Sequence, residues 1–485
     1  MKKLILIIAP VVFLIILFSY KLLEVPRGLT LDEAAFGYNA ALLAKTGRDE
    51  NHRLMPLFVL SSSGTDWRQP VTQYYLTFLF KVFGPSLFLL RFSSVLVVVG
   101  SIAGLYLLAK DILGRQGASI AAVVMATTPL VMIQSHMALD NIMPIPFTLI
   151  WLWGAWRFLK DKSNKYIILM GAVLGLSMYT YKGMRAIVPV WLLISGVLVA
   201  IKTKWRTVLR RWVYLGMAAG PFFLIIPWID RHYAGAMMGG AKAVFNNVYE
   251  LLSPYLSSFD VSYWFVSGDL VTIHSTMMHG MYLLASAPWF FMGIYLALRK
   301  KHNFFYFLLA AFFFGPLLFG LVGSVHRFSR LMMMIPIYSI FVGLSVSWVW
   351  KKKGVLGKMA VILGIFIAGL NYGDFLKYYW KTYPGITESY TGVFTYRKDF
   401  QELDKVSKSN DLTPVISEQV ALSTGESGKF FQMQYFGRLL EVIKDGTPPG
   451  KTEVLLSTED KIVGADFVSR NELFKIHTSS SLINK

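Results

Sequence analysis

The sequence predicts an all-α polytopic membrane protein with a small α/β domain at its C-terminal end. Hydrophobic residues make up 55% of the chain and charged residues only 16%, whereas a soluble domain has about 25% charged residues. The apolar residues lie in continuous runs close to the length of a bilayer crossing, without the alternation of barrel strands, which favours spanning helices. From about residue 373 the composition turns polar and stays so, which predicts the separate C-terminal domain.

These apolar runs predict about eleven transmembrane helices. The first run is interpreted as an uncleaved span rather than a signal peptide, because Lys21–Arg27 is charged and bulky and contains no small-residue cleavage site. Some runs between residues 166 and 201 are short, so a split or re-entrant pair is an alternative there. The expected spans are 4–20, 87–109, 118–135, 143–159, 166–181, 186–201, 212–229, 281–298, 303–323, 331–350 and 355–372.

Clusters of lysine and arginine between the runs predict the orientation of the chain. Such clusters favour the cytoplasmic side of a membrane. We therefore expect a multi-pass protein of the plasma or inner membrane. Its N-terminus is expected in the cytoplasm and its C-terminal domain on the extracytoplasmic side. The net charge of +20 comes from short loops rather than a folded basic domain, so no nucleic-acid partner is expected. The clusters lie in the loops 110–117, 157–165, 202–211, 299–303 and 351–358.

Two domains follow from this pattern. Residues 1–372 are expected to form the transmembrane domain, with long outer loops at 24–86 and 230–280, and residues 373–485 the C-terminal α/β domain. Short helices are expected along the first outer loop, at the membrane surface, and one begins the C-terminal domain. These helices are Asp32–Lys45, Gln73–Phe83 and Tyr396–Val406, and the expected strands are Pro414–Ser417, Glu453–Ser457 and Asp466–Ser469.

Two adjacent acids, Asp32 and Glu33, follow the first span and form the main catalytic candidates. Transfer of a sugar from a lipid phosphate to a hydroxyl needs a base for the acceptor proton, and a carboxylate at the bilayer surface can supply it. We interpret Asp32 as that acid/base residue and Glu33 as its partner. The alternative is that the acids cap a surface helix, with Thr30 or Asp32 at its start.

Cations near the predicted outer ends of spans are the candidate contacts for substrate phosphate. Arginine can pair with two phosphate oxygens at once. The alternatives are snorkelling of Arg91 and headgroup anchoring by the later clusters. These candidate residues are Arg68, Arg91, Lys182, Arg185, His326 and Arg327.

Two further acids in outer loops, Asp140 and Asp269, are candidate substrate-binding residues. An acid at a membrane end is unusual, although an ordinary solvated turn also explains Asp140. Histidines near Asp269 match no metal-ligand spacing, so neither a metal nor another cofactor is expected. The absence of cysteine excludes thiol catalysis and disulfides.

Short motifs along residues 1–350 resemble those of the GT-C superfamily, of the dolichyl-phosphate-mannose protein mannosyltransferase and aminoarabinose transferase type. The C-terminal domain has no comparable match, and Arg68-Gln69-Pro70 stands where similar members often have Lys-Pro-Pro or His-Pro-Pro. The matching motifs are Leu31-Asp32-Glu33-Ala34, Gly37-Tyr38, Gly47-Arg48-Asp49-Glu50, Arg68-Gln69-Pro70, Tyr74-Tyr75, Phe83-Gly84, Leu90-Arg91-Phe92-Ser93-Ser94, Ala138-Leu139-Asp140, Trp264 to Asp269 with Gly280 and Pro288, and His326-Arg327 before Pro336.

This resemblance implies an inverting glycosyltransferase whose donor is a polyprenyl-phosphate monosaccharide and whose acceptor is a lipid, a glycan or a protein. It implies Asp32 as the catalytic residue, with Arg68, Arg91 and Arg327 around the lipid phosphate. Two alternatives remain open at this stage. One is a transporter or flippase of polyprenyl-linked sugars, and the other is a non-catalytic, membrane-anchored assembly protein of the cell envelope.

Overall fold

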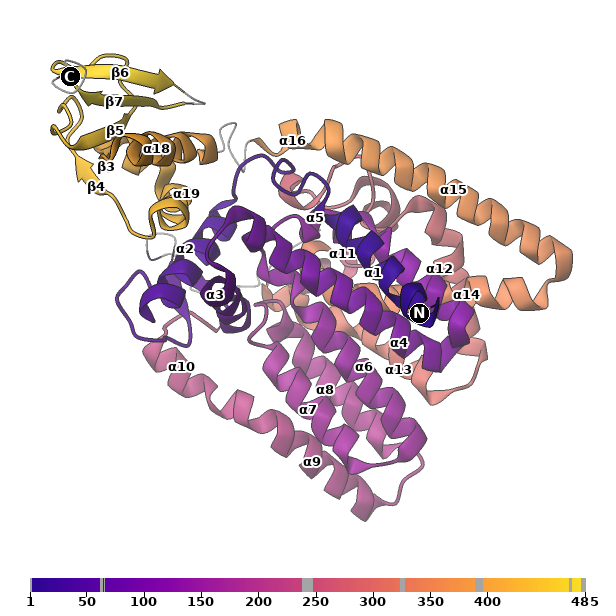
Figure 1. The fold of residues 1–485 in the computed structure, drawn as a ribbon. Helices are drawn as coiled ribbons and strands as arrows, with labels where there is room; N and C mark the ends of the chain where they lie inside the picture. Colours follow the sequence, from indigo (N-terminus) through magenta and orange to yellow (C-terminus); the bar gives the residue numbers. More distant parts are fainter. Residues whose placement is uncertain are drawn as a thin grey trace. The chain divides into compact units, whose positions relative to one another are not determined.

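The computed structural model of the 485-residue chain describes residues 2–61, 64, 66–237, 247–322, 328–388, 396–470 and 473–480. Contacts between residues divide the chain into two compact units, and each is described by itself (Figure 1). Unit 1 comprises Met1–Lys21, Gln69–Thr72 and Phe92–Tyr383, and unit 2 comprises Leu22–Arg68, Gln73–Arg91 and Pro384–Lys485.

The chain is mostly helical, as expected for a polytopic membrane protein with a small C-terminal sheet. Short 3-10 or π segments, labelled η, interrupt the longer helices. The helices are α1 (Lys2–Ser19), α2 (Leu31–Thr46), α3 (Pro70–Phe83), α4 (Leu87–Ala126), α5 (Pro129–Ser135), α6 (Pro144–Asp161), α7 (Asn164–Ser177), α8 (Met184–Ala200), α9 (Trp205–Leu224), α10 (Ile226–His232), α11 (Val248–Ser257), α12 (Ala287–Arg299), α13 (Asn303–Phe314), α14 (Ile335–Lys352), α15 (Gly354–Lys381), α16 (Tyr383–Ile386), α18 (Arg397–Asn410) and α19 (Glu418–Phe436).

The protein is a multi-pass membrane protein. Six helical segments within the described residues are long and apolar enough to cross a bilayer, and four shorter apolar helices accompany them. The spanning segments of unit 1 differ in how much of their apolar stretch is buried inside the protein. In Ser329–Lys352 this share is 94%, whereas in Gly354–Lys381 it is only 11%. An apolar helix left open in this way is suited to contact with lipid rather than water. The total of about eleven spans remains a prediction.

The predicted spans are confirmed as helices, but proline and glycine shift several of their ends. Gly114, with φ of 80°, interrupts α4 where the sequence predicts a loop between two spans. The predicted span 118–135 is divided before Pro129, which has no N–H to donate and therefore starts α5. Similarly, α13 ends at Phe314, and Gly315–Val322 continues as a 3-10 helix around Pro316.

Aromatic packing in unit 1 fixes the outer loop that precedes α12. The rings of Tyr282 and Tyr338 stack with centroids 3.6 Å apart, and Phe290 stacks on Tyr338 at 4.6 Å. Trp264 meets the edge of Phe290 at 5.4 Å and donates a hydrogen bond from Nε1 to the carbonyl of Ser258 at 2.9 Å. Buried aromatic rings with satisfied polar atoms give this loop a defined conformation.

The first helix of unit 2 is α2, which the sequence predicts at Asp32–Lys45. Thr30 is its N-cap: the Thr30 hydroxyl accepts from the Glu33 N–H at 3.0 Å, and the Glu33 carboxylate accepts from the Thr30 N–H at 3.1 Å. This reciprocal capping box fixes the first turn. At the other end Gly47, with φ of 70°, adopts the left-handed conformation that terminates helices and is cheap only for glycine.

The C-terminal part of unit 2 holds a five-stranded mixed sheet with α18 and α19 beside it (Figure 1). The strand order is β4-β3-β5-β7-β6; β3 runs parallel to β4 and β5, and β7 runs antiparallel to β5 and β6. The helix α19 connects the parallel neighbours β3 and β4, as a βαβ unit requires. The strands are β3 (Thr413–Ser417), β4 (Glu441–Ile443), β5 (Glu453–Ser457), β6 (Ala465–Arg470) and β7 (Lys475–Ser479).

The contact-based units do not follow the predicted boundary between residues 372 and 373. The helix α15 extends to Lys381, and residues 22–68 of the first outer loop belong to the same unit as the C-terminal sheet. The boundary at 372 therefore remains a prediction from composition.

Candidate functional site

The adjacent acids of α2 have different environments. The Asp32 side chain is 56% exposed, whereas the Glu33 side chain is fully buried. The capping box uses Thr30 and Glu33, so the first turn does not need Asp32 for its cap. Glu33 therefore takes part in capping the helix, while Asp32 keeps an exposed carboxylate. A capping role and a catalytic role for this acid pair are thus compatible.

Arg68 faces Asp32 within unit 2. Its Nη1 donates to Asp32 Oδ1 at 2.5 Å, and its Nε donates to the Ser61 hydroxyl at 2.6 Å. The guanidinium also lies 5.3 Å from the centre of the Phe36 ring and 3.5 Å from the Asp66 carboxylate. The Arg68 side chain is only 3% exposed. A buried, oriented cation beside an exposed carboxylate is an arrangement suited to an anionic substrate.

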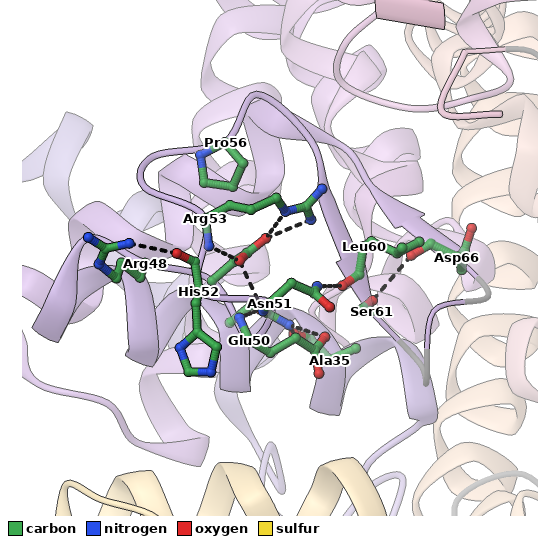
Figure 2. A network of polar contacts seen from close by, with 12 residues as sticks. Ala35, Arg48, Glu50, Asn51, His52, Arg53, Pro56, Leu60, Ser61 and Asp66 are labelled. Atoms are coloured by element: carbon green, nitrogen blue, oxygen red, sulfur yellow. Dashed lines mark hydrogen bonds and ion pairs between the residues drawn. The ribbon is translucent and has the colours of Figure 1, made fainter. Parts of the chain in front are cut away.

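Polar contacts hold the loop that leads to Arg68 (Figure 2). The Arg53 guanidinium forms two hydrogen bonds with Asp49 Oδ2, at 2.9 and 2.7 Å, and Asp49 is buried. Asn51 donates to the carbonyl of Leu60 at 2.7 Å, which ties the loop to β1 (Val59–Ser61). The strand β1 pairs antiparallel with β2 (Asp66–Arg68), so the position of Arg68 follows from this network.

Arg91 is fully buried and bonded on all three of its guanidinium nitrogens. Nε donates to Glu33 Oε1 at 3.1 Å, Nη1 to the carbonyls of Leu22 at 3.0 Å and Pro26 at 2.8 Å, and Nη2 to the Gly28 carbonyl at 2.7 Å. Instead of snorkelling, Arg91 connects the chain entering α2 to the buried acid of its first turn. This geometry favours a positioning role over direct phosphate contact for both Arg91 and Glu33.

Asp140 starts a 3-10 segment of unit 1 and is half-buried. Its neighbour Asn141 donates from Nδ2 to Gln134 Oε1 at 2.7 Å, and Gln134 Nε2 lies 2.8 Å from His274 Nδ1. An amide chain therefore joins the turn after α5 to the second long outer loop. Sequence spacing gave no signal for Gln134 or Asn141.

Lys182 lies between α7 and α8, and Arg185 lies in the first turn of α8. Arg185 donates from Nη2 to Gln69 Oε1 and from Nη1 to the carbonyls of Ala236, at 2.7 Å, and Met237. These bonds join the start of α8 to two distant segments of unit 1. Lys182 is half-buried next to them. Lys182 stays a candidate contact for a substrate phosphate from the sequence.

Asp269 is 2% exposed and accepts backbone hydrogen bonds from Val271 at 3.0 Å and Ser329 at 3.2 Å. These bonds give Asp269 a role in loop architecture. His326 and Arg327 lie outside the described residues. Within the described ranges, no group of three or more histidine, aspartate or glutamate side chains is arranged to hold a metal ion.

The candidate residues are distributed over both units, and the structure pairs four of them. Unit 2 contains Asp32 with Arg68, and Glu33 with Arg91; unit 1 contains Asp140, Lys182, Arg185 and Asp269. Sequence reasoning missed Ser61, Phe36 and Asp66 around Arg68. The glycine at 64 between short β-prone stretches was the available signal for the hairpin that places them.

Comparison with known proteins supports the resemblance seen in the motifs. The profile of the family described as dolichyl-phosphate-mannose-protein mannosyltransferase matches residues 68–229. That stretch contains Arg68, Arg91, Asp140, Lys182 and Arg185, and it begins after Asp32. No curated protein matches the sequence.

Solved structures extend the similarity to nearly the whole chain. ArnT from Cupriavidus metallidurans in the apo state superposes with a TM-score of 0.58 at 11% identity, covering 99% of this chain and 98% of that one. The same protein bound to undecaprenyl phosphate gives a TM-score of 0.57 at 13% identity, covering 99% of both chains. At this level of identity the comparison shows a shared fold: the chain has the fold of ArnT. The fold shared with ArnT covers nearly the whole chain, including the C-terminal sheet, for which the sequence motifs had no counterpart.

Proposed function

We propose that this GT-C-type membrane protein is a glycosyltransferase that moves a monosaccharide from a polyprenyl-phosphate donor to an acceptor hydroxyl. The observation that carries the proposal is the exposed Asp32 carboxylate held 2.5 Å from the buried guanidinium of Arg68. The family profile and the fold support the same class of reaction. The related ArnT structure with bound undecaprenyl phosphate supports a polyprenyl-phosphate carrier.

Asp32 is the proposed general base. Its 56% exposure leaves the carboxylate accessible to an acceptor, whereas Glu33 is fully buried between the Thr30 amide and Arg91. A positioned carboxylate that removes a proton from a hydroxyl nucleophile contributes typically 10²–10⁴-fold to a rate. Glu33 and Arg91 are proposed to orient the first turn of α2, and thereby Asp32.

The proposed step is a single displacement with inversion at the sugar carbon. Asp32 takes the proton of the acceptor hydroxyl while the acceptor oxygen forms a bond to the anomeric carbon. The bond from that carbon to the phosphate oxygen breaks, and its electron pair leaves with the polyprenyl phosphate. Arg68 stabilises the charge that develops on this phosphate, as preorganised cations do in dry sites.

The remaining candidates are assigned from the sequence and, for Arg185 and Asp269, from their contacts. Lys182 is proposed as a further phosphate contact and Asp140 as a contact to the sugar. Arg185 and Asp269 are proposed to position the outer loops, since both are engaged with backbone groups. His326 and Arg327 remain phosphate-binding candidates from the sequence alone.

The reaction is proposed to take place on the extracytoplasmic face of a plasma or inner membrane. The clusters of lysine and arginine in alternate loops support a cytoplasmic N-terminus. With that orientation the outer loop that carries Asp32 and Arg68 faces outward. The acceptor class is a lipid, an envelope glycan or a protein.

The test uses the full-length protein in nanodiscs with a panel of polyprenyl-phosphate sugars labelled in the sugar. The proposal predicts that the sugar–phosphate bond is cleaved and free polyprenyl phosphate accumulates in equal amount to the labelled acceptor. A flippase of polyprenyl-linked sugars, the main alternative, would leave that bond intact while moving the donor between leaflets of a vesicle. Translocation without cleavage across the whole panel would overturn the proposal.

A further inference from the structure

The helix α19 of the C-terminal domain packs directly on α2, the helix that begins with Asp32 and Glu33 (Figure 1). The two helices meet closely at Gly37. A Cβ added at Gly37 would lie 2.8 and 2.9 Å from two ring carbons of Phe430 and 3.0 Å from a methyl group of Leu90. Real Cβ atoms do not approach other carbons so closely, so α2 and α19 are in contact through glycine backbone and an aromatic ring.

The Phe430 ring has little freedom to move away. Phe430 is fully buried, and its ring stacks on Phe80 of α3 with centroids 6.3 Å apart and contacts Phe431 at 5.5 Å. Phe431 in turn stacks on Phe400 of α18 at 6.2 Å. Because packed interiors transmit displacements instead of absorbing them, the position of α2 depends on α19 and on the sheet domain behind it.

Polar contacts secure the same interface on either side of Phe430. Lys45 of α2 donates from Nζ to the Gly437 carbonyl at 2.5 Å, and the Leu87 N–H donates to Gln434 Oε1 at 2.8 Å. Lys429 lies 4.0 Å from the Glu50 carboxylate and 5.4 Å from the centre of the Tyr38 ring. These contacts connect α19 to α2, to the loop after it and to the start of α4.

The register of Gly37 relates this interface to the acids. In a helix, residues four apart lie on the same face. Gly37 is four residues after Glu33, so Phe430 contacts the face of α2 that Arg91 also holds, one turn further along. Displacement of this face moves the first turn, and with it Asp32 relative to Arg68.

We infer that α19 is a positioning element for the proposed reaction: its Phe430 sets the position of α2 and hence the placement of Asp32 against Arg68. This inference rests on the proposed function for its catalytic consequence. It gives the C-terminal domain a part in catalysis without contact to the reacting atoms.

The experiment is a compensation test with Gly37→Ala. Alanine is the better helix former, so helix propensity alone predicts an unchanged or more stable helix. The inference instead predicts a fall in kcat of at least about tenfold, with KM for the polyprenyl-phosphate donor changed less than about twofold. Phe430→Leu, which removes ring carbons at the contact, is expected to restore kcat to within about threefold when combined with Gly37→Ala.

Gly373→Ala is the matched control, since Gly373 lies inside α15 and a Cβ there meets nothing within 4 Å. It is expected to keep wild-type kcat and KM. A fall in kcat with Gly37→Ala that Phe430→Leu does not relieve overturns the inference, as does wild-type activity of Gly37→Ala.

A readout independent of activity separates this inference from the proposed function. The chain has no cysteine, so spin labels can be attached at Leu31→Cys in α2 and Leu422→Cys in α19, which are 59% and 77% exposed. Gly37→Ala is expected to shift the distance distribution between these labels, and Phe430→Leu to reverse the shift. An unchanged distance distribution overturns the inference, even if the enzyme is active. A shifted distribution in a protein that shows no transferase activity supports the positioning by α19 and refutes only the proposed function.

Discussion

Replacement of Arg91 by methionine removes the cation that holds the first turn of α2. In the wild-type protein Arg91 and Glu33 are both fully buried, and Arg91 also binds the carbonyls of Leu22, Pro26 and Gly28. Methionine fills similar volume but donates nothing. The Glu33 carboxylate and three carbonyl groups then remain buried without the hydrogen bonds from Arg91.

The magnitude follows from the cost of breaking a buried ion pair on one side. Removal of one partner of such a pair destabilises a protein by about 3–5 kcal/mol. Single hydrogen bonds to a charged group contribute about 1.5–3 kcal/mol each. A sum over the four hydrogen bonds of Arg91 would exceed the figure for the ion pair, because neighbouring bonds are not additive. We therefore expect Arg91→Met to lower the free energy of unfolding by about 3–5 kcal/mol.

The assay is equilibrium unfolding in mixed micelles of a double-mutant cycle. Glu33→Gln keeps an acceptor for the Thr30 amide while it removes the charge, so the double variant no longer buries a carboxylate that has lost Arg91. The double variant should be more stable than the sum of single effects predicts, by at least about 1.5 kcal/mol. Single effects that add within about 0.5 kcal/mol would refute the coupling of Arg91 to Glu33.

Two further predictions concern charges in unit 2. Arg68→Lys is expected to lower kcat about 10²–10³-fold, because a lysine cannot bind Ser61 and Asp32 in the same fork; steady-state turnover on the polyprenyl-phosphate donor measures this, and wild-type turnover would contradict it. Burial raises the pKa of Glu50 above its ordinary value of 4.5, so the stability that Glu50 contributes is fully present below about pH 4.5 and is lost as pH rises through the raised pKa. Glu50→Gln should therefore gain stability over wild type as pH rises from 4.5 to about 7.5 in unfolding titrations, whereas a pH-independent difference would contradict the assignment.

Much of the fold could be predicted from the sequence, because the main signals for helices and strands are local. Apolar runs identified the spanning helices, and Gly47 marked the end of α2. The short strands at 414–417, 453–457 and 466–469 were confirmed within a residue or two. The sequence missed β7 and the long helix α19, since Gly425 and Gly428 weaken the helical pattern of α19 and its partners are distant in the chain.

The sequence identified candidate residues of the site but did not show which of them are buried and which are exposed. Asp32 and Glu33 are equivalent in sequence, and only tertiary contact with Arg91 separates a buried acid from an exposed one. Arg91 resembled a snorkelling residue because its carbonyl partners have no side-chain signature. The contact between Gly37 and Phe430 joins residues almost four hundred positions apart, which no local pattern records.

The most direct test of the central claim compares Asp32→Asn with Asp66→Asn in the transfer assay. Both variants remove a carboxylate beside Arg68, at 2.5 and 3.5 Å respectively, and both keep the shape of the side chain. If Asp32 is the base, Asp32→Asn lowers kcat by about 10²–10⁴-fold in a folded protein, while Asp66→Asn changes kcat less than about tenfold. Equal losses in the two variants, or wild-type turnover by folded Asp32→Asn, would contradict the assignment of Asp32 as the catalytic base.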